Sequence, residues 1–341
     1  MNCQKDKIWR ITLDTNPEHC NYHCIMCEEH SRYSSFKERL KASGVSSRLM
    51  PKEWLGKIFE QAHQLGISEV IPSTMGEPLL YSGIEEFYGL SKKYGMTVNL
   101  TTNGSFPGKT LEEWAELIIP QTSDVKVSIN GATREVSEPI MVGCNFDRQI
   151  SGIKTLVAYR DKCHAETGHY CSITMQLTFM QNNMHQLADI VKLASELDVD
   201  RIKGHHLWTH FDEIRHLSMK DSPESIAKWN GYVDEAYQAQ DKYRKKNGEK
   251  IRLENIAYLE QDKGTSVPEE SECPFLNREL WVSATGKISP CCAPDNLRAT
   301  LGDFGNIKTD SLTDIVNGSK YQNLVANYKK NELCKTCNMR R

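Results

Sequence analysis

Three cysteines near the N-terminus have the residue type and the spacing best suited to metal chemistry in this chain. Cys20, Cys24 and Cys27 form a C-x3-C-x2-C pattern directly after the apolar run 8–13. Soft thiolates suit zinc, copper and iron–sulfur clusters. A structural zinc site needs four ligands and this group supplies three, whereas a [4Fe–4S] cluster on three thiolates keeps one iron open. The spacing therefore favours a reactive iron–sulfur cluster over unrelated structural thiols.

A second group of cysteines lies at the other end of the chain. It consists of Cys273, Cys291, Cys292, Cys334 and Cys337. Adjacent residues of a strand point to opposite faces, so only one of Cys291 and Cys292 should reach a shared metal. These residues alone leave open which of the two it is. Four such cysteines suit either an auxiliary cluster or a zinc ribbon.

Between the two groups, the hydrophobic pattern alternates between strands and amphipathic helices. Strands are expected at 8–13, 67–72, 96–101, 124–129, 171–179 and 199–203. Helical faces run through 54–65, 84–90, 146–157 and 187–197. Repeated strand–helix units imply parallel strands, and six units fall short of the eight in a closed barrel. We therefore expect an α/β fold, a partial (β/α)6 barrel, with functional residues at the carboxyl ends of its strands.

Composition excludes several classes of protein. The chain has 341 residues and a formal net charge of −3. This charge gives no excess of positive charge that would indicate binding to nucleic acid or to an anionic membrane. No apolar run approaches the length of a membrane span, and residues 1–7 lack the apolar core of a secretory signal. We expect a cytoplasmic protein, where 12 cysteines stay reduced and need an explanation other than disulfides.

The C-x3-C-x2-C motif in this strand–helix context resembles the radical S-adenosylmethionine (SAM) superfamily. The resemblance implies that the open iron of a [4Fe–4S] cluster on Cys20, Cys24 and Cys27 chelates SAM. The reduced cluster then splits SAM into methionine and a 5′-deoxyadenosyl radical. Met26 stands where the family usually has an aromatic residue near the adenine, so a different adenine contact is expected.

Short polar segments after the later strands also resemble the SAM contacts of that family. Met75 to Pro78 is similar to its GGEP motif, which would place the carboxylate of Glu77 beside the SAM ammonium, a charge-assisted pair. Each segment alone would more often be a turn or a helix cap. The expected contacts are Gly76, Glu77, Pro78, Thr102, Asn103, Ser128, Asn130 and Met26.

The C-terminal cysteines resemble a twitch domain, the short relative of the SPASM domain. That resemblance implies an auxiliary [4Fe–4S] cluster on Cys273, Cys291, Cys334 and Cys337, and thus two clusters in all. The expected domains are a barrel at 1–210, a helical bridge at 211–270 that ends in a linker at 261–272, and a twitch domain at 271–341.

The compact chain and its polar strand ends favour a small polar substrate of the sugar or aminocyclitol type, dehydrogenated or epimerised. One alternative is a maturase that epimerises or cross-links a ribosomally made peptide. Another is a non-catalytic iron–sulfur or zinc protein. Cys144 is a candidate hydrogen donor for epimerisation, and a reducing partner such as flavodoxin or ferredoxin is expected. Candidate substrate contacts are His205, His206, His210 and Gln181.

Overall fold

A computed structural model describes most of the chain and divides it into two compact units. The described residues are 7–42, 44, 47–73, 75–260, 267–293, 295–337, 339 and 340. The first unit comprises residues 1–18, 47–99 and 263–341, and the second comprises 19–46 and 100–262. The first half of the expected linker, 261–266, lies outside the described residues. The domain boundaries at 210 and 270 stay predictions.

The first unit is built on parallel strands in the order β3-β2-β1-β8, with β9 antiparallel at the edge. Its strands are β1 (Arg10–Leu13), β2 (Glu69–Ile71), the start of β3 (Thr97–Thr102), β8 (Glu279–Val282) and β9 (Ile288–Ser289). Its helices are α2 (Glu53–Gln64), η1 (Pro78–Leu80), α3 (Ile84–Lys93), α9 (Asp295–Arg298), η5 (Ala299–Leu301), α10 (Leu312–Asn317), α11 (Ser319–Asn327), η6 (Tyr328–Lys330) and α12 (Glu332–Lys335).

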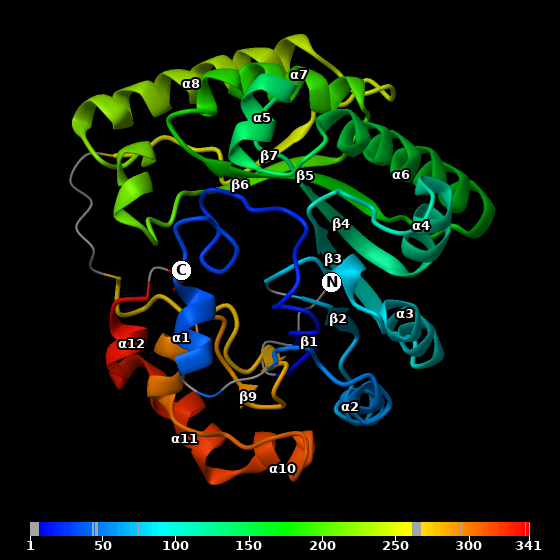
Figure 1. Cartoon of the computed structure of the whole chain (residues 1–341), viewed down its shortest axis with the longest axis vertical. Coiled ribbons are helices and arrows are strands. Elements are labelled where there is room, and N and C mark those ends of the chain that lie inside the picture. Colours follow the sequence, from blue (N-terminus) through cyan, green and yellow to red (C-terminus); the bar gives the residue numbers. More distant parts are fainter. Residues whose placement is uncertain are drawn as a thin grey trace. The chain divides into compact units, whose positions relative to one another are not determined.

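The second unit continues from the end of β3 and contains parallel strands in the order β4-β5-β6-β7. Its further strands are β4 (Thr122–Ser128), β5 (Ser172–Phe179), β6 (Arg201–His206) and β7 (Arg252–Glu254). Its helices are α1 (Phe36–Ala42), α4 (Leu111–Ile118), η2 (Ile119–Gln121), α5 (Arg134–Ile140), α6 (Phe146–Thr167), η3 (Met184–Gln186), α7 (Leu187–Glu196), η4 (Asp212–Leu217) and α8 (Pro223–Lys242). Figure 1 shows α7 and α8 lying side by side above β5 and β6.

The fold class expected from the sequence is confirmed. All six expected strands exist as β1 to β6, each followed by a helix. The pairs β1–β2, β2–β3, β4–β5 and β5–β6 are parallel. Gly66 and Gly95 lie just past the ends of α2 and α3 and have φ of 73° and 65°, the left-handed conformation that favours glycine. No helix among the described residues combines the length and the apolarity that a membrane crossing requires.

Strands β8 and β9 pair antiparallel and form a hairpin around Gly286. Its place in the sheet was not predicted. Strand β8 pairs in parallel with β1, with Thr12 opposite Trp281, and the Thr12 hydroxyl donates to the Glu279 carboxylate at 2.5 Å. The C-terminal residues also bind α2, where the Gln61 side chain accepts from the Leu312 amide at 2.9 Å. The C-terminal segment therefore shares the sheet of the first unit.

Trp229 on α8 fixes that helix against β5 and β6. It is fully buried, and its ring centroid lies 4.6 Å from that of Phe179 and 4.7 Å from that of His206. Its Nε1 donates to the Ala257 carbonyl at 2.8 Å. Phe179 occupies this place because residue 204 is glycine, since a Cβ there would lie 2.2 Å from the Phe179 ring.

We predict that Trp229→Ala lowers the free energy of unfolding by about 3–5 kcal/mol, because it leaves a cavity between α8 and the sheet. Urea denaturation followed by circular dichroism measures this change. Glu235→Ala on the exposed face of the same helix is the control and should change stability by less than about 0.5 kcal/mol. Equal effects of the two substitutions would show that Trp229 does not anchor α8.

Candidate functional site

The loop after β1 brings the first three cysteines together in the second unit. Burial raises the pKa of Cys24 well above its ordinary value, and the nearby Cys27, Cys20 and Cys144 raise it further. Burial also raises the pKa of Cys27, an effect partly offset by the His30 amide, which donates to Cys27 Sγ at 3.4 Å. Close, buried thiols resist ionisation because their thiolates repel one another. A cationic iron–sulfur core would remove that penalty, so this arrangement fits a cluster.

The end of β3 holds the cysteine loop through Asn103. Its Nδ2 donates to Cys20 Sγ at 3.7 Å and to Asn21 Oδ1 at 2.9 Å. Its Oδ1 accepts from the Ser105 amide at 2.9 Å. Asn103 was expected from the sequence to contact SAM, and that contact stays a prediction. In the structure its side-chain amide instead binds the cysteine loop.

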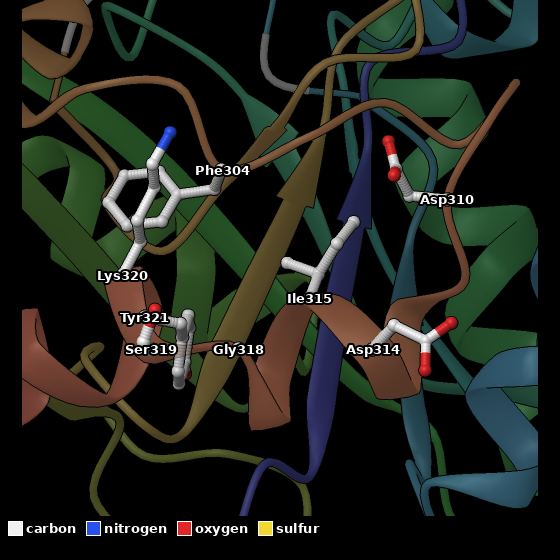
Figure 2. Close-up of a pocket in the computed structure, with 8 residues that line it drawn as sticks. All are labelled: Phe304, Asp310, Asp314, Ile315, Gly318, Ser319, Lys320 and Tyr321. Atoms are coloured by element: carbon white, nitrogen blue, oxygen red, sulfur yellow. The ribbon is translucent and has the colours of Figure 1, made fainter.

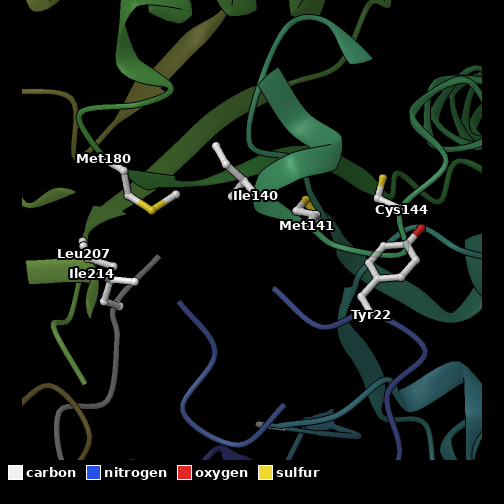
Figure 3. Close-up of a cluster of buried hydrophobic side chains, with 7 residues drawn as sticks. All are labelled: Tyr22, Ile140, Met141, Cys144, Met180, Leu207 and Ile214. Atoms are coloured by element: carbon white, nitrogen blue, oxygen red, sulfur yellow. The ribbon is translucent and has the colours of Figure 1, made fainter. Parts of the chain in front are cut away.

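Cys144 lies in a buried apolar cluster beside the cysteine loop. The cluster consists of Tyr22, Ile140, Met141, Cys144, Met180, Leu207 and Ile214, with Cys20, Cys24 and Met26 packed against it. Cys144 Sγ donates to Gln149 Oε1 at 2.9 Å, and Figure 3 shows the Tyr22 hydroxyl directed toward the same sulfur. Burial raises the pKa of Cys144 to about 11, so this thiol keeps its proton at neutral pH.

The four C-terminal cysteines expected to hold an auxiliary cluster also come together, in the first unit. Burial raises the pKa of Cys273, and Cys291 and Cys337 add to that rise. Burial raises the pKa of Cys334 to about 11, with further contributions from Cys291, Cys273 and Cys337. These mutual electrostatic effects require the four sulfurs to be near neighbours. The arrangement fits a second cluster.

Cys291 and Cys292 interact with each other and are both partly buried. The Ala293 amide donates to Cys291 Sγ at 3.4 Å, and this bond favours the thiolate form of Cys291. That Cys291 rather than Cys292 is the ligand stays a prediction.

Hydrogen-bond direction separates several of the expected cluster ligands from two cysteines outside both groups. The sulfurs of Cys20, Cys27, Cys273 and Cys291 accept from N–H groups. By contrast, the thiols of Cys144 and Cys171 donate to oxygen acceptors. N–H donors stabilise thiolates and are typical around iron–sulfur ligands. Within the described residues, no three His, Cys, Asp or Glu side chains form a group that could hold a single metal ion.

The expected SAM contacts of the first unit surround Glu77. Gly76 has φ of 71°, which favours glycine. Glu77 is fully buried, and its carboxylate accepts from the Leu79 amide at 3.1 Å, where it caps η1, whose first residue is Pro78. Its carbonyl accepts from Asn16 Nδ2 at 2.9 Å. The carboxylate thus has a local structural partner, and its contact with the SAM ammonium stays a prediction.

The expected contacts at the ends of β3 and β4 have internal partners as well. The hydroxyl of buried Thr102 accepts from the Gly104 amide at 3.2 Å. Asn130 Oδ1 accepts from the Thr178 amide at 2.9 Å, and the Ser128 carbonyl accepts from Gln149 Nε2 at 3.0 Å. These bonds join neighbouring strand ends. The SAM contacts predicted for these residues are not tested by this structure.

The candidate substrate residues in β6 and after β5 and β6 have different surroundings in the structure. His205 and His210 are exposed, whereas His206 packs between Phe179 and Trp229. Gln181 Nε2 donates to the carbonyls of His216 and Ser218 and to the Ser225 hydroxyl. Gln181 therefore secures the segment that leads into α8.

Two amide side chains that the sequence analysis did not single out organise this site. Gln149 is fully buried and binds Asn103, Ser128 and Cys144. Asn183 is also fully buried and binds the carbonyls of Asn130 and Thr178. The sequence held one indication that Gln149 is buried. This residue lies one helical turn before Ile153, on the buried face of α6.

A separate cavity of about 270 Å³ lies in the first unit between α10 and α11. Figure 2 shows Asp310 and Asp314 on one side of Ile315, with Phe304 and Lys320 on the other. Asp310 accepts from the Asn306 amide and Asp314 from the Ser311 hydroxyl. Since its charged groups have local partners, the cavity is not assigned a function.

Comparison with protein families decides the identity of the fold. A family model described as the radical SAM superfamily matches residues 17–194, more than half of the chain. This chain belongs to the radical SAM superfamily. A second model, the SPASM iron–sulfur cluster-binding domain, matches residues 273–338. The cofactors of this radical SAM protein are therefore SAM and [4Fe–4S] clusters, as expected from the sequence.

The radical SAM chain is also similar to two curated proteins. It is 21% identical over 316 residues to a PqqA peptide cyclase of Bradyrhizobium diazoefficiens, covering 92% of this chain and 76% of that protein. It is 24% identical over 184 residues to a PqqA peptide cyclase of Streptomyces rochei, covering 54% of this chain and 44% of that protein.

Solved structures share the fold at low identity. Streptococcus suis SuiB bound to the precursor peptide SuiA has a TM-score of 0.63 and 17% identity, covering 97% of this chain and 71% of SuiB. The enzyme anSMEcpe with bound AdoMet has a TM-score of 0.63 and 16% identity, covering 97% of this chain and 86% of its own. These likenesses confirm the radical SAM fold.

The comparisons overturn one expectation. A small sugar or aminocyclitol substrate is wrong as the leading interpretation, because the curated relatives are named peptide cyclases. The structure gives a physical reason for the error. The polar strand ends that favoured a small polar substrate, including Asn130 and Gln181, form hydrogen bonds within the protein.

We predict that Cys24→Ala and Cys334→Ala each remove one cluster, so that each lowers the iron content of anaerobically reconstituted protein by about half. Iron analysis and electron paramagnetic resonance (EPR) spectroscopy measure the loss. Cys163→Ala is the control, because this thiol lies outside both groups and contacts Thr167. Full iron content in Cys24→Ala would contradict the assignment of the first cluster.

We predict that His206 makes the fold sensitive to acid. Burial, then Lys220 and His205, lowers its pKa to about 4. The unfolded chain, with a His pKa of about 6.5, binds the proton more readily, so stability falls as pH drops from about 6.5 to about 4. His206→Phe should flatten this part of a pH series of urea denaturations. The exposed His185→Gln should leave it unchanged.

Proposed function

We propose that this radical SAM protein forms an oxidative cross-link within a ribosomally made peptide. The observation that carries the proposal is the similarity to a PqqA peptide cyclase, which extends over 92% of the chain rather than over one domain. The presence of a SPASM model match in addition to the radical SAM match supports a net oxidation. The complex of SuiB with a precursor peptide is consistent with this choice of substrate.

In this proposal, Cys20, Cys24 and Cys27 hold the SAM cluster, and Cys273, Cys291, Cys334 and Cys337 hold the auxiliary cluster. When bound, these groups supply a 5′-deoxyadenosyl radical that removes one hydrogen atom from the peptide and an acceptor for the electron left when a second hydrogen departs as a proton. The protein positions the peptide and excludes water from the site. Tyr22, Met141 and Met180 form part of an apolar wall beside the cysteine loop, and excluding water there prevents side reactions.

The position of Cys144 favours a cross-link over epimerisation. Epimerisation would require a hydrogen donor that reaches the peptide radical. The Cys144 thiol is only 9% exposed, and its S–H already donates to Gln149. A cross-link needs no such donor, since the peptide loses both hydrogens.

A run of aromatic side chains, which begins beside the cysteine loop at Tyr33 and Phe211, offers contact area for a peptide. The ring centroids of Trp208 and His210 lie 6.1 Å apart, those of His210 and Phe211 6.2 Å, and those of Phe211 and Tyr33 6.2 Å. Trp208 is 48% exposed. Aromatic side chains give large contact areas for apolar and backbone groups of a peptide.

The test uses the anaerobically reconstituted protein with SAM, dithionite and synthetic peptides encoded by short reading frames next to its gene. We predict formation of 5′-deoxyadenosine and methionine, with a peptide product that has lost two hydrogens and yields a cross-linked fragment in tandem mass spectrometry. Cys24→Ala should abolish both outcomes, because SAM cleavage needs the first cluster.

Two variants separate the alternatives in the same assay. Cys334→Ala should retain SAM cleavage but lose the cross-linked product, because the second electron has no acceptor. Cys144→Ala should retain cross-linking. A product of unchanged mass with an inverted residue in the wild type, lost in Cys144→Ala, would replace the cross-linking proposal with epimerisation.

A further inference from the structure

Gln149 has an unusual place for a glutamine, in the first turn of α6 but fully buried. Its Nε2 donates to the carbonyl of Asn103 at 2.5 Å and to that of Ser128 at 3.0 Å. Its Oε1 accepts from Cys144 Sγ at 2.9 Å. Both amide hydrogens and the oxygen are therefore used. This one side chain ties the ends of β3 and β4 to the segment before α6.

The residue that Gln149 holds directly after β3, Asn103, is the one that contacts the cysteine loop. Asn103 donates from Nδ2 to Cys20 Sγ at 3.7 Å and to Asn21 Oδ1 at 2.9 Å. The Ser105 hydroxyl also donates to Asn21 Oδ1, at 3.3 Å. On the other side, the Tyr22 hydroxyl interacts with Cys144. Hydrogen bonds thus connect Gln149 to the cysteine loop by two routes.

We propose that Gln149 is a positioning residue that, through Asn103, holds an N–H donor on the sulfur of Cys20 and thereby raises the reduction potential of the SAM cluster. Reduction adds negative charge to a cluster, and hydrogen bonds to its sulfurs stabilise that charge. The donor acts only while the Asn103 backbone is fixed, and Gln149 fixes it. The inference depends on the radical SAM family and is independent of the substrate.

The test measures the midpoint potential of the SAM cluster by redox titration monitored by EPR. Reconstituted wild type is compared with Gln149→Met, Asn103→Ala and the double variant. Each single variant should shift the potential to more negative values. The double variant should match Asn103→Ala, because effects that act through one shared partner do not add. Formation of 5′-deoxyadenosine without peptide should fall roughly 10–100-fold in each variant.

Two controls separate positioning from general damage. Gln186 is a matched buried glutamine of the second unit, which accepts from the Ala132 amide at 2.8 Å and donates to Thr133, and Gln186→Met should leave the potential unchanged. The auxiliary cluster, bound by residues of the first unit, should keep its potential in every variant. Equal shifts of both clusters would indicate a general disturbance and overturn the proposal.

Asn103→Ala also tests the inference if Gln149→Met does not fold. Asn103 is partly exposed. Asn99→Ala removes the same kind of side chain four residues earlier, within β3, where Asn99 binds Glu69. A more negative potential in Asn103→Ala but not in Asn99→Ala supports the proposal. An unchanged potential in Asn103→Ala overturns it, as does an additive shift in the double variant.

Discussion

The central constraint on this structure is the mutual repulsion of thiolates placed close together out of water. Burial and the neighbouring sulfurs both raise the pKa of Cys24, and the same two causes raise those of Cys273 and Cys334. Without a cation, such groups stay protonated, and their proximity stabilises nothing. The fold has to hold these sulfurs together until iron binds. The surrounding hydrogen bonds can be understood as the means of doing so.

The direction of those hydrogen bonds distinguishes the expected cluster ligands from a neighbouring cysteine that is not expected to bind a cluster. Cys27 and Cys273 each accept from the backbone amide three residues later, a geometry fixed by local chain folding and therefore available before the metal arrives. Cys144 donates its S–H to Gln149 and gains nothing from deprotonation. The same physical chemistry that prepares one sulfur for iron keeps its neighbour a neutral thiol, although Cys144 is close enough to Cys24 to affect its pKa.

The sequence predicted the parts of this arrangement that depend on local pattern. Cysteine spacing predicted the presence of iron–sulfur clusters, which the family comparisons confirm, and apolar periodicity identified the six strands of the barrel. The pairing of β8 with β1 joins residues such as Thr12 and Trp281, and no local pattern encodes a contact between segments so distant in the chain. Gln149 was missed for a related reason. A polar residue in the first turn of a helix is ordinarily solvated. Its place one turn before Ile153 suggests a buried face, but its hydrogen-bond partners follow only from where β3 and β4 end.

The error about the substrate shows why polar residues at strand ends are weak evidence for what an enzyme binds. Parallel strands end together, and their last carbonyl and amide groups need partners when they are buried. Asn130 and Asn183 supply those partners between β4 and β5, and Gln181 does so for the segment before α8. These amides satisfy the backbone first. The cluster against which the cysteine loop packs is mainly apolar or aromatic and includes Tyr22, Met141 and Met180. Such side chains can exclude water from the site without specifying the substrate.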